Sequence, residues 1–313
     1  MASSKPLQVY YHITSEKGLN SVTTLIVGSK AAVVIDAPFL QSDGKEVLKF
    51  IQATTEVPVV ALFATHHHPD HFFAANVIME AYPNSKLYAH PYVRAAVDRE
   101  YDDKVEYWTK IFGRDEIPEQ PLKPEIYNYS FFTLEGDETS PICLLGPVFG
   151  DTIDHTLFWL PREKVVITGD AMYGRSDHVW VGDIETLDIL SAWNATLRLI
   201  EGLQPDLIIP GHLGEGWVPD AKEDLRHMHQ YLDRFESKLA PTLTTGSKTY
   251  SVNEIFQDFK DAFPHCTKHH EFILCNTANQ FGSDGQIWEE NKHHNVAQRT
   301  KDTLEGWCLG PTA

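Results

Sequence analysis

"THHHPDHFFAAN" spans residues 65–76 and places four histidines and one aspartate between positions 66 and 71. Protonated imidazoles repel one another, and none of these side chains favours an apolar core. A bound metal cation would offset the crowding, because neutral imidazoles and carboxylates are metal ligands. The cluster follows a continuous apolar run at 57–65 and precedes an apolar segment at 72–82. We therefore predict a metal-binding loop between a strand buried on both faces and a helix.

Strands and helices are predicted to alternate around this loop. Two β-branched runs at 21–28 and 31–38 are separated by a Gly-Ser-Lys turn, which predicts a β-hairpin. Apolar residues at helical spacing predict a helix at 43–55, and a short strand is expected at 85–90. The resulting order, β-β-α-β-α-β, predicts a sheet covered by helices.

The rest of the chain predicts a second set of strands and a helical end. A helix is expected at 186–203, and strand-like apolar segments lie at 142–147, 155–161, 164–170 and 206–212. From about residue 220 the pattern is helical, and Ser251 with Glu254 is typical of a capping box. We expect a catalytic domain at 1–220 and a mostly helical extension at 221–313 packed on the same domain.

The composition indicates an ordinary globular protein, with 42% hydrophobic and 22% charged residues. No apolar run approaches the ~20 residues of a membrane helix, and the N-terminus lacks the pattern of a secretory signal. We expect a soluble, cytoplasmic protein. No C-x-x-C pair occurs, so we expect buried reduced thiols at the four cysteines, Cys143, Cys266, Cys275 and Cys308.

The net charge of −18 is strongly acidic, and the lysines and arginines are scattered. Such a surface repels phosphate backbones, which disfavours nucleic acid as a partner. We expect a small-molecule substrate and neither a nucleic-acid nor a membrane partner. A homodimer is left open.

Two further strand ends carry ligand-type residues. "VVITGD" ends at Asp170 and "LIIPGH" ends at His212, each directly after a glycine that permits close backbone approach. Functional loops gather at strand ends in layered α/β folds. We therefore expect both side chains to lie near the histidine-rich loop.

These motifs together resemble the metallo-β-lactamase superfamily. The resemblance covers about residues 20–215 and rests on three motifs: His66-x-His68-x-Asp70-His71, Gly169-Asp170 and Pro210-Gly211-His212. It implies an α/β fold, a four-layer αβ/βα sandwich, with a site for two divalent ions between its two sheets. Zinc is the expected metal, and iron or manganese are alternatives.

The resemblance also implies a role for each ligand. His66 and His68 would bind the first ion, and Asp170 would bridge both ions. The second ion would be held by Asp70, His71 and His212. Asp36 matches a family aspartate beneath the site, although a turn cap is an equal alternative.

The third ligand of the first ion departs from the family pattern. Family members usually have Gly-His-Thr before the strand that leads to the bridging aspartate, whereas this chain has Gly150-Asp151-Thr152. An ungapped alignment places Asp151 at the histidine position, and a shift by four residues would use His155. We predict Asp151, because it keeps the preceding glycine and the loop length.

Other polar and aromatic residues are secondary candidates. His67 is expected to pack or to form hydrogen bonds, and the pairs His269-His270 and His293-His294 are expected to be solvated. Tyr173, His178 and Trp180 follow the bridging aspartate, where family members place substrate-contacting residues. Plain aromatic packing is the alternative. The segment 92–132 reads as either a lid or a surface insertion.

The resemblance implies hydrolysis of an acyl bond by a hydroxide that bridges the two ions. We favour a cyclic amide or ester, a lactam or a lactone, because the aromatic-rich segment 92–132 suggests an apolar or aromatic ring substrate. An acyl thioester is the second choice. Iron-dependent persulfide oxidation is a redox alternative on the same fold, and a scaffold without metal is disfavoured by the retained ligands.

Overall fold

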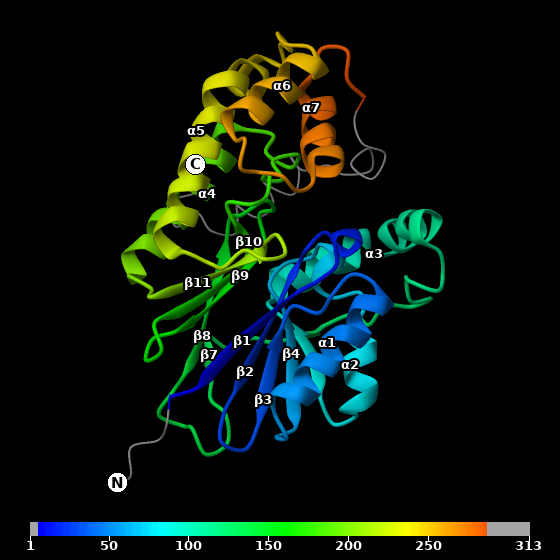
Figure 1. Cartoon of the computed structure of the whole chain (residues 1–313), viewed down its shortest axis with the longest axis vertical. Coiled ribbons are helices and arrows are strands. Elements are labelled where there is room, and N and C mark those ends of the chain that lie inside the picture. The colour runs from blue at the N-terminus through cyan, green and yellow to red at the C-terminus, as the bar shows by residue number, and fades with distance from the viewer. Residues whose placement is uncertain (1–5, 287–313) are drawn as a thin grey trace, which may run out of the picture.

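The computed structural model describes residues 6–286 and contains two β-sheets (Figure 1). The first sheet has the order β1-β2-β3-β4-β5-β6, and the second has the order β11-β10-β9-β8-β7. The first sheet comprises β1 (Gln8–Ile13), β2 (Val22–Val27), β3 (Ala32–Ile35), β4 (Val59–Ala64), β5 (Lys86–Ala89) and β6 (Glu125–Ile126). The second comprises β7 (Phe131–Phe132), β8 (Ile142–Val148), β9 (His155–Leu160), β10 (Val165–Tyr173) and β11 (Leu207–His212).

Alternating side chains of the first sheet separate two apolar layers. Ile26 and Val33 face the second sheet and pack with Phe158 and Ile209. Their neighbours in sequence point the other way, because successive strand residues project to opposite faces. Those side chains pack against α1 (Gln41–Thr54) and α2 (Ala75–Ala81).

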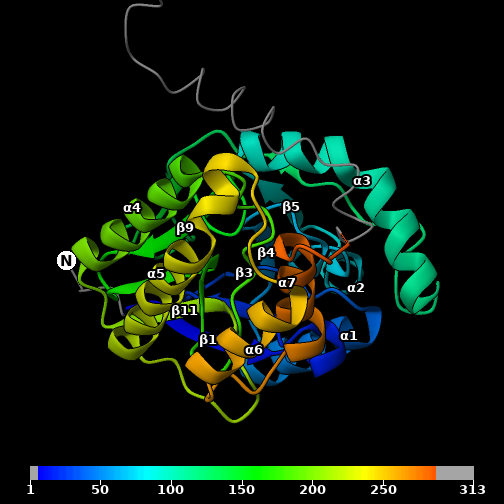
Figure 2. The same ribbon diagram turned by 90° about the horizontal axis from the view of Figure 1, so that it is seen from above.

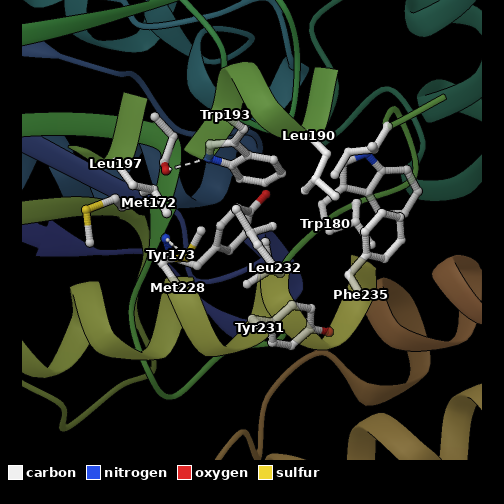
Figure 3. Packing of buried hydrophobic residues seen from close by; sticks show 14 of the residues in the cluster. Met172, Tyr173, Trp180, Leu190, Trp193, Leu197, Met228, Tyr231, Leu232 and Phe235 are labelled. Atoms are coloured by element: carbon white, nitrogen blue, oxygen red, sulfur yellow. Dashed lines mark hydrogen bonds between the residues drawn. The ribbon is translucent and has the colours of Figure 1, made fainter. Parts of the chain in front are cut away.

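The outer face of the second sheet is covered by α4 (Leu187–Leu203) and α5 (Ala221–Thr245). Two further helices, α6 (Val252–Ala262) and α7 (Cys275–Phe281), lie beyond the strand ends and share an apolar cluster with them (Figure 1). We call their shared apolar cluster the C-terminal core; it includes Trp193, Ile208, Phe235, Phe259 and Ala278. Figure 3 shows part of this core, including Trp193 and Phe235. The layer order is therefore helix, sheet, sheet, helix, and the predicted αβ/βα sandwich is confirmed.

One long helix, α3 (Pro91–Phe112), lies at the end of the sheets where α6 and α7 also lie (Figure 2). The Trp108 ring of α3 lies 5.9 Å from the ring of Phe272, which belongs to a π-helical turn (His270–Leu274) just before α7. Segments about 160 residues apart in the chain therefore meet above the strand ends.

Most predicted elements are confirmed, and the main differences are as follows. The hairpin and the capping box at Ser251 and Glu254 are present. The first strand, β1, was not predicted. The helix expected at 72–82 begins only at Ala75, because Pro69–His71 forms a separate 3-10 turn. The strand expected to be buried on both faces has one outward residue, Val60, which is 43% exposed.

The structure bears on the predictions about membrane helices and about the cysteines. Within residues 6–286, no helix combines the length and apolarity needed to cross a membrane. Cys266 is a buried free thiol, whereas Cys143 and Cys275 are free thiols that are only partly buried. Cys308 lies outside the described residues.

The C-terminal core contains a histidine that makes folding acid-sensitive. His227 is 3% exposed, and its Nε2–H donates to the Asp177 carbonyl oxygen at 3.2 Å. Burial, assisted by the nearby His265, lowers the pKa of His227 from 6.5 to about 4. The unfolded chain therefore binds a proton below pH 6.5 that the folded chain binds only near pH 4. Stability from this group is complete above pH 6.5 and is lost as the pH falls toward 4.

We predict that His227→Gln shrinks the stability loss between pH 7 and pH 4.5 by about 2 kcal/mol. Urea unfolding at the two pH values measures the effect. His229→Gln is the matched control, because His229 lies on the same helix with a partly exposed side chain. An unchanged pH dependence in His227→Gln would show that this histidine does not control acid stability.

Candidate metal centre

The histidine-rich loop meets β10 and β11 at a point where only glycine fits. Gly169 has a φ of +50°, and a Cβ there would lie 2.3 Å from Thr65 Oγ1. A Cβ on Gly211 would lie 1.9 Å from Asp170 Oδ1. β10 does not end at Asp170, as the sequence suggested, but continues to Tyr173 through a register shift. The two glycines and this irregularity bring the backbones close enough for the ligand side chains to converge.

A first group of ligand atoms comes from three segments. One atom from each of four residues lies within 4.8 Å of the others: His66, His68, Asp151 and Asp170. His66 Nε2 is 3.9 Å from Asp151 Oδ1 and 4.0 Å from Asp170 Oδ2. His68 Nδ1 is 3.1 Å from Asp151 Oδ2. Imidazole nitrogens and carboxylate oxygens thus converge on one small volume.

A second group, Asp70, His71 and His212, lies beside the first. Nε2 of His212 is 3.3 Å from Asp70 Oδ2, and Nε2 of His71 is 3.5 Å from the same oxygen. Asp170 also reaches both histidines, with Oδ1 3.1 Å from His71 Nε2 and Oδ2 3.0 Å from His212 Nε2. Asp170 therefore lies between the two groups, as a bridging ligand must.

Three imidazoles are held so that Nε2 faces this volume. Nδ1 of His66 contacts the Thr65 hydroxyl at 3.0 Å, and Nδ1–H of His212 donates to the Leu19 carbonyl at 2.7 Å. Nδ1 of His71 is 2.9 Å from Asp36 Oδ2. Nε2 of His66, fully buried, makes no hydrogen bond among the described residues. Second ring nitrogens held in this way are characteristic of metal-binding histidines, so the residues fit divalent ions.

Asp36 lies beneath the second group and also supports the loop. Its Oδ1 accepts from the Thr65 backbone N–H at 2.8 Å, and its Oδ2 accepts from the Thr65 hydroxyl at 2.9 Å. Its backbone has a φ of +60°, which is uncommon for a non-glycine residue. Asp36 therefore lies beneath the site, and these hydrogen bonds join distant segments rather than cap a local turn.

Asp151 and His155 are both buried and in contact with each other. His155 Nε2 is 2.7 Å from Asp151 Oδ1, and the His155 ring stacks on the His66 ring at 4.2 Å between centroids. Asp151 belongs to the first ligand group, whereas His155 does not. In this arrangement His155 supports the carboxylate from behind.

Burial lowers the pKa of His68, His71 and His212, but the neighbouring carboxylates outweigh it and raise the pKa of all three, so a cation would displace protons from these rings. Two other ligands already favour the metal-binding form. Burial and the neighbouring His155 and His71 place the pKa of His66 well below its ordinary value, so its imidazole is neutral. Burial raises the pKa of Asp70, but the charges of His71 and His212 outweigh it and bring it to about 2. Neutral imidazole and ionised carboxylate are the metal-binding forms.

Tyr173 contacts the ligand groups from the C-terminal core. Its hydroxyl donates to Asp170 Oδ2 at 2.6 Å and lies 3.1 Å from Asp151 Oδ2. Its backbone N–H contacts the Met228 sulfur at 3.3 Å (Figure 3). Burial, with the Asp151 and Asp170 carboxylates, holds the pKa of Tyr173 well above 10. The phenol therefore keeps its proton at neutral pH and acts as a hydrogen-bond donor.

His178 and Trp180 were predicted alongside Tyr173 as pocket residues, and the structure separates them. Trp180 lines the cavity at the ligand groups. His178 is fully buried, does not line that cavity, and has Nδ1 3.2 Å from the Tyr231 hydroxyl of α5. Packing between β10 and α5 draws its ring into the C-terminal core.

His67 connects the ligand loop to α3. Its Nδ1 is 2.9 Å from Asp154 Oδ1, and its Nε2 is 2.9 Å from Glu100 Oε2. The hydrogen-bonding role expected for His67 is therefore what the structure shows. Lys104, 3% exposed, lies one helical turn beyond Glu100 with Nζ 3.3 Å from Oε2. The two α3 residues gave no sequence signal, because their spacing is equally typical of an exposed helix face.

The expectation that His269 is solvated is wrong. It is 7% exposed, and its Nε2 is 3.2 Å from Asp177 Oδ1. The segment before α7 folds back across the strand ends, through a bridge between Asp177 and Lys268, and this buries the ring. The side chain of His270 and the pair His293-His294 lie outside the described residues.

A cavity of about 50 Å³ opens onto the ligand groups. Its walls include five residues that the sequence did not indicate: Leu19, Lys104, Trp108, Phe272 and Ile273. They come from three distant segments, so only the tertiary fold brings them together. Lys104 and Trp108 belong to the segment 92–132, which therefore forms a wall of the site.

Comparisons with known proteins agree with this geometry. Residues 17–212 match the family described as "Metallo-beta-lactamase superfamily". A "probable metallo-hydrolase" of Streptococcus pyogenes serotype M6 is 26% identical over 178 residues, which are 55% of this chain and 71% of that protein.

Two solved structures share the fold. TMB-1 is 18% identical, with a TM-score of 0.51 over 73% of this chain and 98% of that chain. A metallo-beta-lactamase from Pontibacter korlensis is 15% identical, with a TM-score of 0.52 over 74% of this chain and 97% of that chain.

Proposed function

The chain belongs to the metallo-β-lactamase superfamily, and on this premise we propose that it hydrolyses an acyl bond of a small molecule with the help of two divalent ions. The observation that supports this proposal most is the pair of ligand groups joined by Asp170. His66, His68, Asp151 and Asp170 would hold one ion, and Asp70, His71, His212 and Asp170 the other. Bound zinc would activate water and polarise a carbonyl oxygen at neutral pH.

The protein's own groups would orient the ligands and position the substrate. Tyr173 keeps its hydroxyl proton and donates it in a hydrogen bond to Asp170, beside Asp151, so it would orient these carboxylates rather than act as a general acid. Lys104 adds a buried positive charge to the cavity wall. Trp108 and Phe272 exclude water from the same space.

The preferred substrate is a cyclic amide or ester. A cavity of about 50 Å³ with aromatic walls admits a small reacting group and few accompanying polar atoms. A lactone or lactam ring is compact, and its hydrolysis gives one product that leaves without a second fragment. An acyl thioester is the second candidate, and persulfide oxidation would require iron.

The proposed function is tested by metal analysis followed by activity on matched lactones, lactams and thioesters. We expect about two ions per chain and metal-dependent ring opening of a lactone or lactam. If the protein hydrolyses thioesters but neither lactones nor lactams, the substrate class is an acyl thioester. Metal-loaded protein that hydrolyses no acyl bond would refute the function.

We predict that Asp151→Ala lowers the metal content from about two ions to about one per chain, because it removes a ligand of the first ion only. His155→Phe keeps the aromatic stack on His66 and should retain both ions. Mass-spectrometric metal counting of the two purified variants decides between them. Loss of one ion in His155→Phe with both ions kept in Asp151→Ala would reverse the assignment.

A further inference from the structure

A second, larger cavity of about 600 Å³ lies beside the cavity at the ligand groups. Three residues, Leu19, Trp108 and Phe272, line both spaces. We call the larger cavity the outer chamber, because only these shared side chains stand between it and the metal cavity in the two linings.

The outer chamber has an apolar wall on α3, a polar wall that includes Thr267, His269 and Asn276, and a charged rim. Tyr107, Ile111 and Phe112 of α3 form one wall. The Phe112 ring stacks on Trp108 at 5.7 Å between centroids. At the rim, Lys17 pairs with Glu116 at 3.0 Å, and Glu16 pairs with Lys268 at 3.0 Å. The charges at the rim are thus already paired, so a ligand need not carry a charge to neutralise them.

Ile111 is the most informative residue of this wall. It is 55% exposed although it lines the chamber. An apolar occupant that covers this side chain would gain free energy from its burial. The two cavities also differ more than tenfold in volume, so the reacting group of a ligand must be much smaller than the rest of it.

We propose that the outer chamber binds a hydrocarbon tail of the substrate while the acyl group reaches the metal cavity. The substrate class is then an ester or amide, cyclic in the preferred case, that carries an extended alkyl chain. This inference rests on the proposed function for the reacting end, but tail binding itself requires no chemistry.

Tail binding is tested with probes that contain no acyl bond. Straight-chain alkan-1-ols of four to ten carbons are titrated into the metal-loaded protein by calorimetry. Each added methylene should raise the association constant about fourfold, as expected for burial of one CH₂ group. Ile111→Asp should lower the increment per methylene to less than twofold. Leu199→Asp is the matched control, because Leu199 is a 41% exposed leucine on α4 that does not line the chamber.

A second measurement separates this proposal from the proposed function. Lactones with alkyl substituents of one to eight carbons are compared by kcat/KM in the wild type and both variants. A rise with chain length that Ile111→Asp removes and Leu199→Asp keeps supports the tail chamber. If the protein hydrolyses the lactones but neither kcat/KM nor the alkanol association constant depends on chain length, the proposed tail binding is wrong and the proposed hydrolase function stands. Chain-length-dependent alkanol binding without any acyl hydrolysis overturns the hydrolase instead. If Ile111→Asp leaves the increase in association constant per methylene unchanged, the tail binds elsewhere and the proposal is wrong.

Discussion

Asp70→Asn is expected to lower kcat/KM about a thousandfold, equivalent to ~4 kcal/mol of transition-state stabilisation. The Asp70 carboxylate lies 3.3 Å from His212 Nε2 and 3.5 Å from His71 Nε2, so it faces the same point as both imidazoles. A neutral amide of the same shape keeps the packing but is a poor ligand. Steady-state kinetics at saturating metal, with circular dichroism to confirm the fold, measure the effect.

The matched control for this prediction is Asp206→Asn. Asp206 has a side chain 74% exposed and lies 3.9 Å from Lys164, far from any ligand role. It should leave kcat/KM within twofold of the wild type, since exposed ion pairs contribute little. His212→Ala should lose activity as Asp70→Asn does. Near-normal turnover in both site variants would contradict the assignment of the second ligand group.

Removal of metal is expected to abolish hydrolysis and to lower the free energy of unfolding by at least ~3 kcal/mol relative to protein at a metal concentration 100 times Kd. Asp70, Asp151 and Asp170 are all buried within the two ligand groups. Without cations their mutual repulsion is offset only by protons on neighbouring imidazoles. Dialysis against a chelator, followed by thermal unfolding and by reconstitution with zinc, iron or manganese in turn, measures both losses.

The matched comparison is Asp70→Asn carried through the same dialysis. This variant holds fewer ions, so chelation should lower its unfolding temperature less than that of the wild type. An unfolding temperature of the wild type that does not respond to chelator, together with full activity, would exclude a metal-dependent site.

The residues that the sequence located are those that occur in compact motifs at ends of apolar runs. His66, His68, Asp70 and His71 lie in one loop, so local spacing is enough to find them. Asp170 and His212 follow apolar strands and glycines, and the shared rim of the sheets brings them to that loop. β1 could also have been found, because Val9, Tyr10 and Tyr11 are strong strand formers.

The residues that the sequence did not locate depend on contacts between distant segments. Trp108 and Phe272 meet over the site although they are 164 positions apart, and no local pattern records that contact. In the sequence, His269 and His270 form a polar pair that is typical of an exposed segment. The β-bridge between Lys268 and Asp177 holds this segment against the fold, and His269 is buried. Burial of this kind is decided by topology, which periodicity does not encode.

The C-terminal core has a consequence for synthesis of the chain on the ribosome. Its sheet side is supplied by β10 and β11, which end at Tyr173 and His212, whereas its covering side chains extend to Phe281. A nascent chain that has released the whole ligand set thus still exposes Trp193 and Ile208 to water. Chains generally fold from the N-terminus during synthesis, and apolar surface that is exposed before the rest of the chain is made promotes aggregation. A premature stop between 213 and 220 would therefore yield a chain with every ligand but without α5, α6 and α7, whose apolar side chains complete the core.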